Sequence, residues 1–185
     1  MSTRAADASA GADDGCGDRH IVLVGMMGAG KSSVGRVLAR RLERRLLDSD
    51  EMIEAATGRT VREIWRDDGE AAFRALEAGQ LGEALEDAEP AIVAAAGGVV
   101  LSAPNRDLLK GARAHVVWLS ADVDLLVDRV RNGMHRPLLD DDPEATLRAM
   151  AESREPLYRD VADAIVSVDH RSVNDVAGAV LRCAG

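Results

Sequence analysis

Short apolar runs alternate along this chain with longer stretches in which apolar residues recur at helical spacing. Apolar strands that are joined by helices pair in parallel, and helices then cover both faces of the sheet. The pattern therefore predicts an α/β fold with a five-stranded parallel sheet flanked by helices on both faces. The predicted strands cover 21–24, 46–50, 92–95, 115–119 and 164–168.

The clearest helical stripe begins directly after the first strand, where Val34, Val37, Leu38 and Leu42 share one face. Thr60, followed three residues later by Glu63, forms a capping box that starts a short helix. The other predicted helices cover 51–57 with a stop at Gly58, 70–85 after a break at Gly69, a short segment opened by Ser102 and Pro104, 121–131 capped by Ser120, 143 to just before Pro156, and 173–183.

Two segments lack such patterning. Residues 1–18 consist mostly of Ala, Asp, Gly and Ser, which predicts a disordered tail and not a secretory signal. Residues 132–142 are polar and rich in Gly, Pro and Asp, which predicts a mobile lid. With no internal repeat or linker, residues 19–185 are predicted to form one domain.

The stretch Gly25-Met-Met-Gly28-Ala29-Gly30-Lys31-Ser32 matches the phosphate-binding P-loop pattern, with a strand before it and a helix after it. Glycines allow backbone N–H groups to surround a phosphate, and the helix N-terminus favours an anion at the same place. Lys31 can reach the β- and γ-phosphates, and the Ser32 hydroxyl can ligate Mg²⁺. The residues predicted to bind ATP here are Gly28, Ala29, Gly30, Lys31, Ser32 and Ser33.

Charge and cysteine content limit the binding partners and the cellular compartment that we expect. The formal net charge of −9 argues against nucleic acid as a partner. No apolar run approaches the length of a membrane span, so no membrane partner is expected. Cys16 and Cys183 do not have the spacing of metal ligands. The simplest interpretation is that they are free thiols in a reducing compartment. We therefore expect a cytoplasmic protein, and we expect it to be a monomer.

Residues suited to binding or catalysis come directly after the second and third predicted strands. In parallel sheets, ligands bind at this end of the strands. Asp48 and Asp50 are two residues apart, so on an extended strand both would point to one side, one toward Mg²⁺ through water and the other toward a substrate hydroxyl. The alternative is an Asp-Ser-Asp turn that caps the next helix. Arg74, Arg136 and Arg154 stand out among the arginines by context, and arginine suits bidentate capture of carboxylate or phosphate.

These residues together resemble the shikimate kinase family. The matching pieces are GMMGAGKSSVGR, LLDSD, TGRTVREIWRDDGEAAFRALE, GGVV, RPLL and REPLY, and the resemblance spans Arg19 to about Leu181. It implies a single-domain P-loop kinase that transfers the γ-phosphoryl group of ATP to the 3-hydroxyl of shikimate with Mg²⁺.

The resemblance also implies roles for individual residues. Lys31, Asp50 and Arg136 would be catalytic, with Asp50 holding the reacting hydroxyl and Arg136 descending with the lid. Ser32, with Asp48 through water, would hold the metal. Substrate would contact Asp50, Arg74, Gly97, Gly98 and Arg154, with Trp65 and Phe73 lining the pocket, and ATP would also contact Arg136, Arg171 and, in a looser alignment, Arg129.

One departure concerns the third strand end, where the family usually has three glycines and this chain has Ala96-Gly97-Gly98. An alanine costs little where φ is negative and strains the chain where φ is positive. Two alternatives to a shikimate kinase stay open: a related kinase for another hydroxylated acid such as gluconate, or for a cyclitol, and a non-catalytic nucleotide-binding paralogue. Arg74 and Arg154 favour a carboxylated substrate.

Overall fold

The protein contains a five-stranded parallel sheet, seen in a computed structural model that describes residues 17–131 and 142–185. The strand order is β2-β3-β1-β4-β5. Most of the predicted tail, most of the predicted lid, Cys16 and Arg136 lie outside the described residues. The strands are β1 (His20–Val24), β2 (Leu46–Asp48), β3 (Ile92–Ala94), β4 (Ala114–Ser120) and β5 (Ala164–Ser167).

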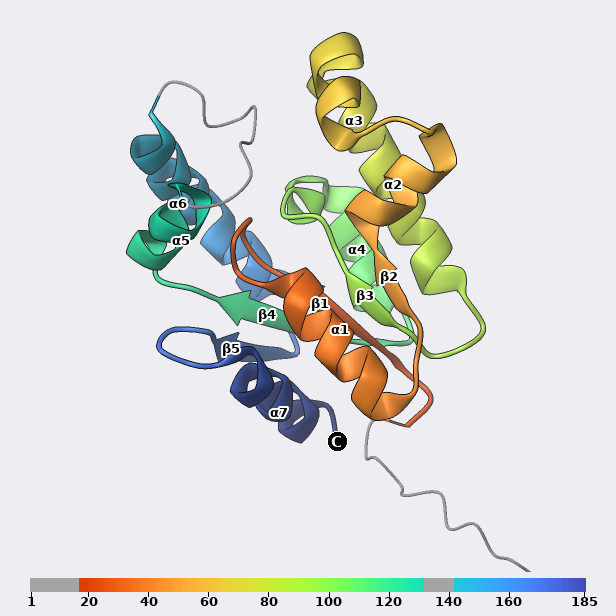
Figure 1. The fold of residues 1–185 in the computed structure, drawn as a ribbon. Helices are drawn as coiled ribbons and strands as arrows, with labels where there is room; N and C mark the ends of the chain where they lie inside the picture. The colour runs from red at the N-terminus through yellow and green to blue at the C-terminus, as the bar shows by residue number, and fades with distance from the viewer. Residues whose placement is uncertain (1–16, 132–141) are drawn as a thin grey trace, which may run out of the picture.

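Helices cover both faces of this sheet, as predicted. In Figure 1, α1 and α7 lie side by side in front of the strands, and α4 and α6 lie behind them. None of the helices within the described ranges is both long and apolar enough to cross a membrane. The helices are α1 (Lys31–Leu42), α2 (Ser49–Thr57), α3 (Val61–Glu86), α4 (Ala103–Gly111), α5 (Val123–Arg131), α6 (Pro143–Val161) and α7 (Val173–Ala184), with a 3₁₀ turn, η1, at Val99–Leu101.

The strands form the centre of the core because both of their faces are covered. All five residues of β1 and all three of β3 are buried. The register pairs Leu23 with Ala94, and Ala94 with Asp48, so β1, β3 and β2 end side by side. The segments that follow these three strands therefore start from the same edge of the sheet.

Local signals explain most helix boundaries. The capping box between Thr60 and Glu63 is present at the start of α3, and Gly58 ends α2 with a φ of 66°. Gly69 (φ 81°, ψ 177°) kinks α3 where the sequence predicts a break. The capping residue expected for α5 was wrong: Ser120 is the last residue of β4, and the Asp122 carbonyl accepts the first helical hydrogen bond, from Leu126.

The predicted end of α6 before Pro156 was also wrong, because the helix continues to Val161. Proline removes one backbone donor from a helix interior and costs roughly 3 kcal/mol there. Beyond the proline, however, Tyr158 is 1% exposed and Val161 is 4% exposed. Burial of these two side chains against the core outweighs the local penalty.

Candidate functional site

The loop between β1 and α1 has the shape that its sequence predicts. Gly25 has a φ of 143°, and a Cβ atom there would lie 2.6 Å from the carbonyl oxygen of Leu119. Gly30 (φ 90°) is the N-cap of α1, whose first turn has no acidic residue, so the N-terminus of the helix suits an anion. Lys31 Nζ donates to the carbonyl oxygens of Gly25 at 2.8 Å and Met26 at 3.1 Å, which holds the ammonium group over the loop.

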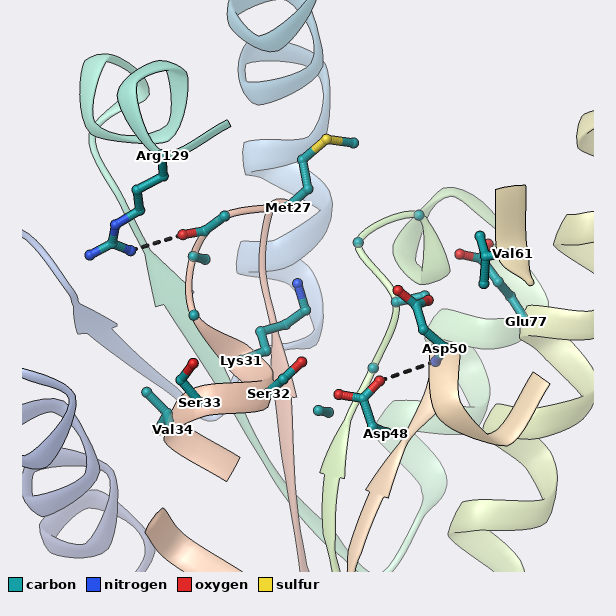
Figure 2. A pocket seen from close by; sticks show the side chains of 18 of the residues that line it. Met27, Lys31, Ser32, Ser33, Val34, Asp48, Asp50, Val61, Glu77 and Arg129 are labelled. Carbon is teal, nitrogen blue, oxygen red and sulfur yellow. Dashed lines mark hydrogen bonds between the residues drawn. The ribbon is translucent and has the colours of Figure 1, made fainter. Parts of the chain in front are cut away.

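A cavity of about 930 Å³ opens beside this loop. Figure 2 shows the loop on one side of it and Asp50, Val61 and Glu77 on the other. Arg136 lies outside the described residues, so its role stays a prediction. Every other predicted site residue lines the cavity: Gly28, Ala29, Gly30, Lys31, Ser32, Ser33, Asp48, Asp50, Arg74, Gly97, Gly98, Arg154 and Arg171.

Asp48 and Asp50 both reach the cavity, but the predicted reason was wrong. The strand β2 ends at Asp48, and Asp50 lies in the first turn of α2. The Asp50 backbone N–H donates to Asp48 Oδ1 at 3.1 Å, so Asp48 also caps α2. The capping and site interpretations are therefore compatible, and a helical turn, not strand alternation, directs both carboxylates to this cavity.

Ser32 and Asp48 are the oxygen donors that could hold Mg²⁺. Figure 2 shows them on facing sides of the cavity, and Asp48 is only 7% exposed, so a cation beside it would balance a largely desolvated carboxylate. Within residues 17–131 and 142–185, no cluster of three or more His, Cys, Asp or Glu side chains could hold a metal ion. This sparse donor set fits Mg²⁺, which uses one or two protein ligands together with phosphate oxygens and water.

Arg74 lies between two carboxylates of its own helix. Its Nη1 donates to Glu77 Oε2 at 2.5 Å, and its Nε and Nη2 donate to Glu70 Oε1 at 3.3 and 3.1 Å. Burial raises the pKa of Glu77, and the Arg74 cation opposes that rise. The guanidinium carbon also lies 5.5 Å from the ring centre of Trp65 and 5.6 Å from that of Phe73. These contacts hold Arg74 in one place on the cavity wall.

Arg154 projects from α6 and is 6% exposed. Its Nη1 donates to the Gly97 carbonyl oxygen at 3.3 Å, and the Tyr158 hydroxyl, one turn later, donates to the same oxygen at 2.6 Å. Burial raises the pKa of Tyr158 to about 12, so its hydroxyl stays a donor at neutral pH. Tyr158 was not predicted as a site residue, because the helix was expected to end before Pro156. The four-residue spacing from Arg154 was the signal that could have revealed it.

The alanine at the end of β3 is not strained. Among the described residues other than glycine, only Glu43 and His170 have a positive φ, so Ala96 avoids the left-handed region. Gly98 has a φ of −90°. A need for close approach, and not for left-handed backbone, therefore explains the glycine at 98, and Ala96 is the case in which alanine costs little.

Two arginines border the loop end of the cavity. Arg129 Nη1 donates to the Gly28 carbonyl oxygen at 2.8 Å (Figure 2). Arg171 donates to the carbonyl oxygens of Ser167 at 3.2 Å and Asp175 at 3.3 Å. Planar guanidinium groups stack on aromatic rings, so this surface could accept a purine base. It is completed by the apolar side chains of Val168, Val173 and Val176.

The chain is similar to known proteins over most of its length. A family model described as shikimate kinase matches residues 27–184. The shikimate kinase of Halorhodospira halophila is 47% identical over 159 residues, which cover 85% of this chain and 89% of that protein. The shikimate kinase of Streptomyces coelicolor is 47% identical over 161 residues, which cover 87% and 92%.

Solved structures agree with this similarity. A structure of shikimate kinase from Acinetobacter baumannii in complex with shikimate superimposes with a TM-score of 0.84 at 41% identity, covering 89% of this chain and 91% of that one. A gluconokinase from Sinorhizobium meliloti superimposes with a TM-score of 0.60 at 21% identity, covering 90% and 91%, which shows a shared fold alone.

Proposed function

This chain belongs to the shikimate kinase family, and on that premise we propose that it transfers the γ-phosphoryl group of ATP to the 3-hydroxyl group of shikimate. The observation that carries the proposal is one cavity lined by both a P-loop and the arginine pair Arg74 and Arg154. The P-loop suits the phosphates of a nucleoside triphosphate, and the arginine pair suits the carboxylate of a small acid. A kinase must hold the two reactants in contact, because much of its rate enhancement comes from orientation.

At the loop end, backbone N–H groups and the N-terminus of α1 bind the phosphates of ATP. Lys31 exchanges its two carbonyl contacts for phosphate oxygens. Ser32, with Asp48 through water, would hold Mg²⁺. When bound, Mg²⁺ neutralises phosphate charge and helps to align the γ-phosphoryl group. Arg129 and Arg171 flank the base.

At the opposite end, Arg74 and Arg154 bind the substrate carboxylate through charge-assisted hydrogen bonds. Asp50 accepts a hydrogen bond from the attacking hydroxyl group, which it orients or deprotonates. Gly97 lets the backbone approach the ring, and Gly98 leaves room for the Arg74 guanidinium. No covalent intermediate on the protein is required, because positioning and charge stabilisation supply the catalysis.

The arginine pair also separates this proposal from kinases of uncharged polyols. A cyclitol carries no carboxylate and would leave the buried Arg154, which bonds to the Gly97 carbonyl oxygen and to no carboxylate among the described residues, without a carboxylate to bind, which costs binding free energy. A carboxylated hydroxy acid supplies that carboxylate. The arrangement therefore supports shikimate over inositol-type substrates.

A substrate panel tests the proposal directly. The purified chain is incubated with ATP and Mg²⁺, and ADP release is measured with shikimate, gluconate, myo-inositol or no acceptor. We expect ADP release that depends on shikimate, with shikimate 3-phosphate as the product by mass spectrometry. Equal turnover with gluconate or inositol would overturn the substrate assignment. ATP binding without turnover on any acceptor would instead support a non-catalytic paralogue.

A further inference from the structure

Four carboxylates line the cavity beside the two arginines assigned to the substrate. They belong to Asp48, Asp50, Glu54 and Glu77, and the whole chain has a formal net charge of −9. A carboxylated substrate is itself an anion, so this field opposes its approach. Local cations must offset the repulsion where the substrate enters.

The two arginines assigned to the carboxylate are already engaged. Arg74 donates to both Glu70 and Glu77, so its charge is balanced by two neighbouring carboxylates. Arg154 donates to the Gly97 carbonyl oxygen and is buried. Such groups can fix a bound anion in place, but they contribute little attraction at the cavity entrance.

Arg62 differs from both. It lines the cavity, its side chain is exposed, and it makes no ion pair with any residue that the structure describes. Its chain neighbour Val61 lies on the Asp50 and Glu77 side of the cavity in Figure 2, away from the P-loop. An exposed residue that also lines a cavity lies at its mouth.

The position of Arg62 within its helix argues against a purely structural role. It lies in the first turn of α3, two residues after the N-cap Thr60. A cation in the first helical turn opposes the helix dipole and slightly weakens the helix. Arg62 therefore does not stabilise α3 through its charge.

We propose that Arg62 is a specificity-determining residue, which attracts the carboxylate of the substrate into the cavity and selects for acids over uncharged polyols. This inference rests on the proposed function and extends it to a side chain at the entrance. Attraction at an exposed site acts mainly on substrate capture, so it changes KM and leaves the chemical step unaffected. It also weakens as salt screens the charges.

The same helix offers a matched control. Arg66 lies one turn after Arg62 and is also exposed, but it pairs with Asp67 through two hydrogen bonds of 2.6 and 3.0 Å and does not line the cavity. Removing either arginine changes the net charge of the protein by the same amount. A difference between the two variants therefore reports position and not overall charge.

The experiment compares Arg62→Ala, Arg62→Lys and Arg66→Ala by steady-state kinetics at low and high salt. Exposed charge interactions are weak, so we expect Arg62→Ala to raise the KM for shikimate by about two- to fivefold. The kcat, the KM for ATP and the unfolding temperature should stay unchanged. Arg62→Lys should restore most of the loss, 0.5 M KCl should remove most of the difference, and Arg66→Ala should behave as the parent protein.

Several outcomes would overturn the inference: an unchanged KM in Arg62→Ala, an equal rise in Arg66→Ala, or a change in kcat or in the KM for ATP alone. A further arm measures the affinity for shikimate by isothermal titration calorimetry without ATP. If the parent protein bound shikimate but did not phosphorylate it, the proposed function would fail. The ratio of the two dissociation constants, for Arg62→Ala and the parent, would still test Arg62.

Discussion

The guanidinium group of Arg74 lies so close to Gly98 that a Cβ atom added at Gly98 would be 1.9 Å from Arg74 Nη1. Gly98 therefore leaves the space that this guanidinium occupies. The same Nη1 donates to Glu77, so the bare backbone at 98 and the buried carboxylate at 77 together fix one arginine on the cavity wall.

We predict that Gly98→Ala impairs substrate binding without unfolding the protein. The atoms that would clash belong to the end of a flexible side chain, so Arg74 moves and the backbone stays. Losing one charge-assisted contact to a carboxylate costs about 1.5–3 kcal/mol, which corresponds to at least a tenfold rise in the KM for shikimate.

The matched control for this prediction is Gly79→Ala on α3, where an added Cβ meets nothing within 4 Å. That variant should keep its KM and gain about 0.5–1 kcal/mol of stability, because alanine favours helix more than glycine does. Kinetics and urea unfolding of both variants provide the measurement. An unchanged KM in Gly98→Ala would show that Arg74 does not depend on this space.

The predictability of the site differs from one residue to the next. The P-loop was predictable in full, because glycine spacing, the preceding strand and the following helix are all local properties of the sequence. The five strands were predictable for the same reason, within two residues at every end, and the largest difference is at β2, which stops at Asp48. The close approach of Arg74 to Gly98 was not predictable in this way. It joins residues 24 positions apart and depends on how α3 packs beside the end of β3.

Two errors show where local reasoning stops. A proline normally ends a helix, but Tyr158 and Val161 bury enough surface to carry α6 past Pro156. Asp48 and Asp50 were placed on one side by strand alternation, although a helical turn separates them. Both carboxylates line the cavity as predicted, although the strand geometry expected for them was wrong. In the first case burial beyond the local segment decided the backbone, and in the second the local cap formed by Asp48 did.

Asp50→Asn tests the residue assigned to the reacting hydroxyl group. The amide keeps the shape of the side chain but cannot accept a proton, so kcat should fall by about 10²-fold or more. The dissociation constant for ATP should change little, because the P-loop lies across the cavity from residue 50 (Figure 2). A near-normal kcat would remove Asp50 from this role.

The control for Asp50→Asn is the adjacent Glu51→Gln. Glu51 is exposed and pairs with Arg36 at 2.9 Å on the surface, away from the cavity. Exposed pairs contribute at most about 1 kcal/mol. Both kcat and nucleotide affinity should therefore stay at the level of the parent protein. Steady-state kinetics and a titration with a fluorescent ATP analogue measure the two quantities.

His115 gives folding stability a pH dependence of known sign. Burial lowers the pKa of His115, partly opposed by Asp163, and no described residue forms a hydrogen bond to its buried Nε2 atom. The unfolded chain therefore takes up a proton near pH 6.5 more readily than the folded protein does. Stability from the neutral form is present above pH 6.5 and is lost as the pH falls toward the folded-state pKa.

The measurement is urea unfolding of the parent and of His115→Val at pH 7.5 and 5.5. The parent should lose more free energy of unfolding than the variant over this interval, by at most about 1.4 kcal/mol per pH unit for one proton. Valine suits a strand and does not titrate. Equal losses in the two proteins would show that His115 does not contribute to the pH dependence.

Ala96→Gly tests whether the alanine at the end of β3 limits activity. Ala96 lacks a positive φ, and its carbonyl oxygen already accepts a hydrogen bond from the Val99 N–H at 3.1 Å, so a glycine would relieve no strain. We expect kcat/KM to stay unchanged and the free energy of unfolding to fall by about 0.4–1 kcal/mol, because glycine gives the unfolded chain more freedom. A clear rise in kcat/KM would instead mean that the Ala96 methyl group obstructs the cavity, since the backbone gives it no other way to cost activity.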